Sequence, residues 1–124
     1  MKVRRDKLDR VFSEFIRTRD NWTCQVCGKY HPPDARKSLH CSHFHSRRKQ
    51  SVRFDPSNAC AKCFACHQRL GENPLEFAAF IEARLGKEET QLLNVRANQI
   101  VKRSKKDKEA LYQDLKADLE RLSL

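Results

Sequence analysis

Two pairs of cysteines, each pair separated by two residues, are the clearest candidates for chemistry in the sequence. Cys24 and Cys27 form the first pair, and Cys63 and Cys66 form the second. Two thiolates at this spacing can hold one ion when the chain turns between them, and four thiolates suit a tetrahedral zinc ion. Cys60 also lies three residues before Cys63, so spacing alone leaves open which cysteines form the second pair. The sequence therefore predicts a structural Zn²⁺ held by four cysteines.

Four of the five histidines lie either at positions 40–45, between the two cysteine pairs, or directly after the second pair, whereas His31 is expected to lie in a loop. The four are His40, His43, His45 and His67. Four sulfurs already fill the coordination of zinc, whereas a reactive metal needs an open position and other ligands. A single histidine is usually a surface or core residue, but this clustering favours a second site in which imidazoles bind a metal or transfer protons. Cys41 and Cys60 are expected to be small core residues.

Positive charge is concentrated in the same part of the chain. The 124 residues have a formal net charge of +10, and residues 21–70 carry nine basic and two acidic side chains. Residues 71–124 carry ten of each sign. A charge that served only solubility would be spread evenly, so this basic middle predicts a polyanionic partner, with nucleic acid preferred.

The sequence lacks the features of an exported or membrane protein. Its first twenty residues hold seven basic and four acidic side chains and no apolar run of a signal peptide. No stretch approaches the roughly 18 apolar residues of a membrane span. We expect a cytoplasmic protein with no membrane association, in which cysteines hold metal more often than they form disulfides.

The elements that must position these residues follow from apolar spacing. The length fits a single domain over residues 1–124. An apolar stripe predicts a helix within residues 1–20: Leu8, Val11, Phe12, Phe15 and Ile16. No helical period persists over residues 22–69, so loops and short strands are expected up to the second cysteine pair.

The last part of the chain is expected to be helical. Asn73 as N-cap, Pro74 at the first helical position and Glu76 as the partner in a capping box predict a helix that ends at Gly86. Residues 87–101 are expected to continue as helix, with a solvated break at 102–106. The final helix has one leucine side: Leu111, Leu115, Leu119 and Leu122. That side can pack on the domain or on a second copy of the chain, as a homodimer.

The order of residues over positions 20–80 resembles the HNH nucleases, a family with a ββα-metal core. The resemblance rests on His43, Asn58 and Cys63-x2-Cys66-His67, with a cysteine pair upstream. Several short sequence motifs are similar to those of the NinG-type (Rap-type) recombination nucleases of phages. They are Arg19-Asp20, Cys24-x2-Cys27-Gly28, His40-x2-His43-Phe44, Ser46-Arg47, Arg53-Phe54-Asp55-x2-Asn58 and Leu70-Gly71-Glu72-Asn73.

The resemblance implies an α+β fold and a cellular setting. The fold would be a small zinc-stapled ββα-metal core at residues 21–72, between an N-terminal helix at 1–20 and a helical region at 73–124. The setting would be the cytosol of a bacterial or phage-infected cell.

The resemblance also implies a role for each matching residue. His43 would be the general base, Asn58 would hold the hairpin geometry, and His67 would bind the catalytic divalent ion. In the family pattern this histidine directly follows the second cysteine pair. Only Cys63 and Cys66 satisfy that order, which favours them over the alternative pair Cys60 and Cys63.

One position departs from the family pattern. Many HNH nucleases have a metal-binding Asp directly before the base histidine, and Ser42 stands there in this chain. Serine is a poor ligand for Mg²⁺. In an extended strand His40 would share a face with Ser42, so we expect His40 to supply the missing ligand and to favour Mn²⁺ or Ni²⁺ over Mg²⁺.

The predicted activity is hydrolysis of DNA phosphodiester bonds by an endonuclease. The unperturbed pKa of histidine suits deprotonation of water near neutral pH, and Mg²⁺, Mn²⁺ or another divalent ion would offset the charge that develops on the phosphate. The rate should rise with pH through about 6.5. Six basic residues are expected to contact phosphates: Arg47, Arg48, Lys49, Arg53, Lys62 and Arg69. No helix is suited to reading base edges, which agrees with the branched recombination intermediates that the NinG-type resemblance implies.

Two other classes of function fit parts of the sequence. The first is a zinc-stabilised module that binds DNA without cleaving it. Ser42 favours this alternative, because it replaces the metal-binding Asp of the family. A zinc nucleobase deaminase needs a His-x-Glu motif. No histidine of this chain is followed two residues later by Glu, which excludes that class.

Overall fold

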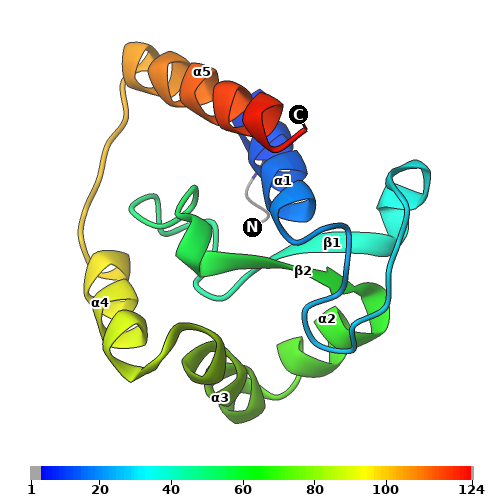
Figure 1. Ribbon diagram of the computed structural model, residues 1–124. Helices are drawn as coiled ribbons and strands as arrows, with labels where there is room; N and C mark the ends of the chain where they lie inside the picture. Colours follow the sequence, from blue (N-terminus) through cyan, green and yellow to red (C-terminus); the bar gives the residue numbers. More distant parts are fainter. Residues whose placement is uncertain (1–3, 124) are drawn as a thin grey trace.

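A two-stranded antiparallel sheet lies at the centre of the molecule, and helices are arranged around it (Figure 1). The computed structural model describes residues 4–123. In chain order its elements are α1 (Lys7–Arg19), the 3₁₀ helix η1 (Pro33–Ser38), β1 (Leu39–His43), the 3₁₀ helix η2 (Pro56–Asn58), β2 (Ala59–Cys63), α2 (Phe64–Gly71), α3 (Pro74–Leu85), α4 (Lys87–Ala97) and α5 (Lys105–Leu122). The predicted α+β fold class is confirmed, because the chain combines a two-stranded sheet with helices.

The register of β1 and β2 decides which residues share a face of the sheet. Leu39 pairs with Cys63, and His43 pairs with Ala59. Because side chains alternate along a strand, one face carries His40, Ser42, Cys60 and Lys62. The opposite face carries His43 and Cys41 and packs against α1. The expectation that His40 and Ser42 share a face is therefore confirmed.

α1 forms where the apolar spacing predicts a helix within residues 1–20. The Asp6 carboxylate accepts a hydrogen bond from the Asp9 N–H at 3.0 Å, and the Asp9 carboxylate accepts one from the Asp6 N–H at 2.9 Å. This capping box satisfies backbone donors that the first turn leaves open. The buried stripe of α1 comprises Leu8, Phe12 and Ile16. It forms the main core together with Phe54, Ala59 and Leu115.

α2 is a helix that apolar spacing did not predict. It begins directly after β2 and contacts both strands, so a helix follows two paired strands in the chain. Its eight residues make only about two turns and bury one side chain, Leu70. A segment this short has too few positions to show a helical period.

α3 begins and ends where expected, but its predicted capping box is absent. The Asn73 side chain caps nothing in α3, and its Nδ2 donates instead to the backbone oxygen of Arg69 at 2.6 Å. Only Glu72 and Asn73 separate α2 from α3, so Asn73 serves the end of the earlier helix. Gly86, with φ of 87°, adopts the left-handed conformation that ends α3.

The two C-terminal helices differ in detail from the prediction. α4 ends at Ala97 rather than near 101, and the break covers residues 98–104. α5 then begins inside the expected break, because Ser104 and Asp107 form a capping box in which the Ser104 Oγ accepts from the Asp107 N–H at 3.1 Å.

α5 packs along α1 within the same chain (Figure 1). Leu111 and Leu115 of its leucine side contact the α1 core, so this part of the side is used inside the domain. A homodimer through the same helices stays a prediction. None of the helices within residues 4–123 combines the length and the apolar character needed to cross a membrane.

Candidate functional site

Four cysteines from three segments converge at one end of the sheet. Cys24 and Cys27 lie in the turn after α1, Cys63 ends β2, and Cys66 lies in the first turn of α2. Their sulfur atoms all lie within 4.8 Å of one another, and those of Cys27 and Cys63 are 3.9 Å apart. Four sulfurs at about 2.3 Å from a central zinc would be about 3.8 Å apart, so the four sulfurs fit a zinc ion.

The protonation of these thiols supports the same interpretation. Burial raises the pKa of the Cys24 thiol, but hydrogen bonds from the backbone of Cys27 and Cys63 outweigh it and lower this pKa to about 7. Burial and hydrogen bonds with the Cys63 and Cys24 thiols raise the pKa of Cys66 to about 12. The four thiols therefore cannot all ionise near neutral pH unless a cation offsets their charge.

The two remaining cysteines lie outside this cluster. Cys60 is buried, and burial raises the pKa of its thiol. Burial also raises the pKa of Cys41, to about 12. Both behave as small core residues, as expected. The choice of Cys63 and Cys66 as the second pair is confirmed by the geometry of the cluster.

His40 of β1 and His67 of α2 lie next to each other. Their Nδ1 atoms are 2.9 Å apart, and their rings are tilted by 74°. Two nitrogens each about 2.1 Å from an octahedral ion would be about 3.0 Å apart, so this pair has a spacing suited to two adjacent ligands. Burial and the nearby charges of His40 and Lys62 lower the pKa of His67 to about 4. His67 is therefore neutral at pH 7, the form that binds metals.

Ser42 adds an unsatisfied polar atom to the face that carries His40. Its Oγ is buried and has no hydrogen-bond partner among the described residues. A buried hydroxyl normally finds a partner, so this atom can accept a water or a ligand. No third His, Cys, Asp or Glu joins the His40–His67 pair within residues 4–123, which leaves most coordination positions of an ion to water or substrate.

His43 is fixed in one orientation by the loop that follows β1. Its Nε2 lies 3.0 Å from the backbone oxygen of Arg53. A carbonyl oxygen can only accept, so Nε2 carries the proton and Nδ1 keeps its lone pair. The ring contacts Phe12 of α1, with centroids 5.7 Å apart. Burial lowers the pKa of His43 below its usual value, which favours the neutral imidazole that a general base needs.

Asn58 holds the loop that joins the two strands. It is fully buried, its Oδ1 accepts from the His45 N–H at 2.8 Å, and its Nδ2 donates to the backbone oxygens of His45 and Val52. These bonds occupy the whole carboxamide. Asn58 therefore fixes the path of residues 44–58, as the resemblance implies, and does not contact a reacting group directly.

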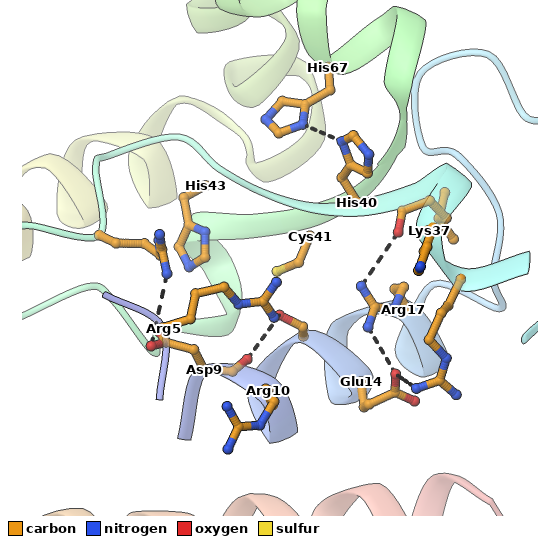
Figure 2. A pocket seen from close by; sticks show the side chains of 14 residues that line it. Arg5, Asp9, Arg10, Glu14, Arg17, Lys37, His40, Cys41, His43 and His67 are labelled. Carbon is orange, nitrogen blue, oxygen red and sulfur yellow. Dashed lines mark hydrogen bonds and ion pairs between the residues drawn. The ribbon is translucent and has the colours of Figure 1, made fainter. Parts of the chain in front are cut away.

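One cleft brings the three histidines together. It has a volume of about 850 Å³ and is lined by His40 and His43 of β1, His67 of α2, and parts of α1 and η1. Figure 2 shows His40 and His67 on one side of β1 and His43 on the side of α1, so the cleft follows the outer edge of this strand. The same cleft is lined by six basic residues and two acidic residues: Arg5, Arg10, Arg17, Arg36, Lys37 and Arg47, with Asp9 and Glu14.

The predicted phosphate contacts are not all available at the surface. Arg47 lines the cleft, Arg48 and Lys49 are exposed on the following loop, and Arg69 is exposed on α2 near Glu76. Arg53 is buried, and its guanidinium donates to both oxygens of the Asp9 carboxylate. Its predicted contact with DNA is wrong in this structure, because the side chain is already paired inside the fold.

Lys62 is the second correction to the predicted contacts. It is fully buried, and its Nζ has no hydrogen-bond partner among the described residues. The ammonium group lies 3.4 Å from the ring centre of Phe77 and 5.3 Å from that of Phe80, both on α3. Burial lowers its pKa to about 8. A phosphate cannot reach Lys62 unless α3 moves.

Sequence reasoning missed the contribution of α1 to the site. Asp9 pairs with Arg53, whose backbone oxygen orients His43, so a residue of α1 helps to position the predicted base. Burial raises the pKa of Asp9, but the hydrogen bonds from Arg53 outweigh it and keep this pKa below its usual value. The only signal in the sequence was an acidic residue within the apolar stripe of the helix.

Comparison with known proteins identifies one family. The family model described as bacteriophage lambda NinG protein matches residues 2–123, which is nearly the whole chain. No curated protein and no solved structure gives a match.

Proposed function

The chain belongs to the family of the bacteriophage lambda NinG protein, and from this premise we propose that it is a metal-dependent DNA endonuclease with His43 as general base. The single observation that carries the proposal is the cleft in which His43 and the His40–His67 pair lie together, lined by an excess of basic side chains. An oriented base, a place for a cation and positive charge for the substrate are what phosphodiester hydrolysis requires.

The proposed mechanism assigns one task to each of the three histidines. The unprotonated Nδ1 of His43 takes a proton from the attacking water, while the bond from Nε2 to Arg53 keeps the ring in place. His40 and His67, whose Nδ1 atoms are 2.9 Å apart, would hold a divalent ion. That ion, Mn²⁺ or Mg²⁺, would offset the charge on the scissile phosphate and the leaving oxygen. Basic side chains of the cleft bind the neighbouring phosphates.

Branched DNA is the proposed substrate class. Each helix that borders the cleft presents arginine, lysine, histidine or acidic side chains to it, and no Asn or Gln among residues 4–123 lines it. Contacts to phosphates position DNA without reading its sequence, whereas adenine is commonly read by Asn or Gln. The shape of the substrate is therefore a better candidate for recognition than its sequence.

Nicking of supercoiled plasmid tests this activity. The zinc-loaded protein should convert supercoiled DNA to the nicked form with Mn²⁺ or Mg²⁺, and His43→Ala should slow the reaction by about a hundredfold or more. Nicking that persists at the same rate in His43→Ala would reject His43 as the base and point to a contaminant.

A second function is favoured by one specific observation. Ser42 occupies the position that a metal-binding Asp holds in many HNH nucleases, and residues 4–123 then offer two close ligands, His40 and His67, for a catalytic ion. A zinc-stabilised module that binds DNA without cleaving it would have these features. Binding of a four-way DNA junction without cleavage under any of the divalent ions would support this alternative over the nuclease.

A further inference from the structure

The side of the cleft formed by α1 and η1 carries four basic residues to which the sequence assigned no function. They are Arg10 and Arg17 of α1 and Arg36 and Lys37 of η1. We refer to these four residues as the α1–η1 wall. The wall faces the outer edge of β1, along which His40 and His43 lie.

Two guanidinium groups of the wall converge on one carboxylate oxygen. Glu14 Oε1 accepts from Arg17 Nη2 at 2.9 Å and from Arg36 Nη1 at 2.7 Å (Figure 2). Both guanidinium groups also lie near the ring of Trp22, at 5.5 and 5.8 Å from its centre. Glu14 already occupies this oxyanion position, and the Arg17 side chain is only 11% exposed, so Arg36, at 54% exposed, is the one of the two that can reach a phosphate.

The other two residues of the wall present unpaired charge. Arg10 and Lys37 are exposed, and neither side chain forms a hydrogen bond or an ion pair with any residue in the described part of the chain. Exposed, unpaired cations at the rim of a cleft attract phosphates and lose little on binding them. The wall therefore presents three exposed cations, Arg10, Arg36 and Lys37, while Arg17 holds Arg36 in position through Glu14.

The size of the cleft limits what can lie against the wall. Pockets of about 300–1,000 Å³ enclose a molecule of drug size, and the cleft measures about 850 Å³. A few nucleotides of one strand fit in this volume. β1 pairs only with β2 within the described residues, so its outer edge is open, and its five residues extend about 16 Å.

We propose that the α1–η1 wall binds the backbone phosphates of a single DNA strand that runs along the outer edge of β1 past the three histidines. This inference rests on the proposed function in taking DNA as the partner. It narrows the substrate to DNA with unpaired nucleotides at the cleavage point, as at a branch or a flap. The bases then point away from the wall, and the phosphates lie between it and the histidines.

Trp22 provides a direct readout, because it is the only tryptophan in the chain. Its ring lies beside Arg17 and Arg36, so a phosphate bound there changes its surroundings. Titration of the zinc-loaded protein with single-stranded DNA, without added divalent ion, should change the tryptophan fluorescence with a saturating curve. Duplex DNA of the same sequence should give a weaker response at the same concentration.

Paired variants test the wall itself. Arg36→Gln with Lys37→Gln should weaken binding of labelled single-stranded DNA about fivefold and reduce the slope of log affinity against log salt by about 0.7 per lost contact. Arg121→Gln with Lys116→Gln is the matched control, because these two exposed residues of α5 lie outside the cleft and the double variant removes the same charge. It should change affinity less than twofold.

The outcomes separate this inference from the proposed nuclease activity. Unchanged affinity and salt slope in the Arg36/Lys37 variant, or no change in Trp22 fluorescence at saturating DNA, would overturn the wall even if the protein cleaves DNA. A loss of affinity confined to this variant would support the wall even if wild-type protein shows no cleavage. Matching circular dichroism spectra of the variants would confirm that they are folded.

Discussion

At the scale of single residues, the orientation of His43 gives the most specific expectation. The bond to the Arg53 carbonyl fixes the proton on Nε2 and leaves Nδ1 as the base. Burial lowers the pKa of the ring below 6.5, because the charged imidazolium loses solvation inside the cleft. Sequence alone suggested a value near the reference pKa, since solvent access to a side chain is not visible in its spacing.

This shift predicts the pH dependence of cleavage. The neutral imidazole is the active form, so the rate should rise as pH increases through the lowered pKa, with a midpoint below the ordinary histidine value. Single-turnover cleavage at constant ionic strength and saturating Mn²⁺ measures this profile. A midpoint at or above pH 6.5 would contradict the assignment of the buried His43 as the base.

The His40–His67 pair predicts the effect of a ligand substitution. His40→Ala should weaken binding of the catalytic Mn²⁺ at least tenfold while the structural zinc remains, because the two sites share no side chain. Activity should return in part at high Mn²⁺. Retention of full Mn²⁺ affinity and full activity in this variant would remove His40 from the site.

The sequence did not reveal which individual basic side chains are exposed and which are buried. The cysteine spacing predicted the cluster of four cysteines that the structure shows, because metal coordination demands a fixed local geometry. Charge has no such spacing requirement. Arg53 is paired inside the fold and Lys62 is buried beneath aromatic rings of α3, and only the packing of distant elements decides this.

At the scale of elements, α1 connects the core with the site. Its apolar stripe packs on the sheet, while Asp9 at its start pairs with Arg53 of the loop after β1. The helix itself could be predicted from apolar spacing. Its role in the site could not, because the ion pair joins residues 44 positions apart in the chain.

Loss of this ion pair should destabilise the protein measurably. Asp9→Asn leaves the buried guanidinium of Arg53 without a counter-charge, so the free energy of unfolding should fall by about 3 kcal/mol. Chemical denaturation of the zinc-loaded variant measures the change. The double variant Asp9→Asn with Arg53→Met should be more stable than Asp9→Asn alone. A change below about 1 kcal/mol in the single variant would show that the pair contributes little.

The other helices could be predicted where the sequence carries a long apolar pattern or a clear end signal, and not elsewhere. α3 and α5 carry long apolar patterns and end signals such as Gly86, and their positions were predicted within a few residues. α2 was missed because it is short and owes its helical form to its place after β2 and beside Cys66. Asn73 was expected to cap α3, but the short link between α2 and α3 directs its side chain to α2.

At the scale of the whole molecule, the four-cysteine cluster joins three segments that a small core and hydrogen bonds such as Gln25 N–H to the Ala61 oxygen also connect. It links the turn after α1 with the end of β2 and the start of α2, and the small core beside it contains few large side chains. Zinc would therefore set the relative position of α1, the sheet and His67. The sequence predicted this cluster, whereas the packing of α5 on α1 needed the structure.

Substitution of one cysteine of the cluster should show whether it binds zinc or is merely a buried side chain. Cys63→Ala should lose bound zinc and lower the free energy of unfolding by at least about 3 kcal/mol. Cys60→Ala is the matched control, because this buried cysteine lies outside the cluster and should keep one zinc per chain. Elemental analysis and thermal unfolding measure both effects. Loss of zinc in Cys60→Ala with retention in Cys63→Ala would contradict the ligand set.

The central claim is that one cleft combines an oriented histidine base with a metal held by two other histidines. The most direct measurement is the single-turnover rate of four-way junction cleavage with Mn²⁺, for wild type, His43→Ala and His45→Ala. His45 lies two residues from His43 but bonds to Asn94 outside the cleft, so its variant controls for loss of an imidazole nearby. We predict that His45→Ala keeps the wild-type rate within about threefold and that His43→Ala loses about a hundredfold or more. Equal rates in the two variants, or no cleavage by wild type with any divalent ion, would contradict the account.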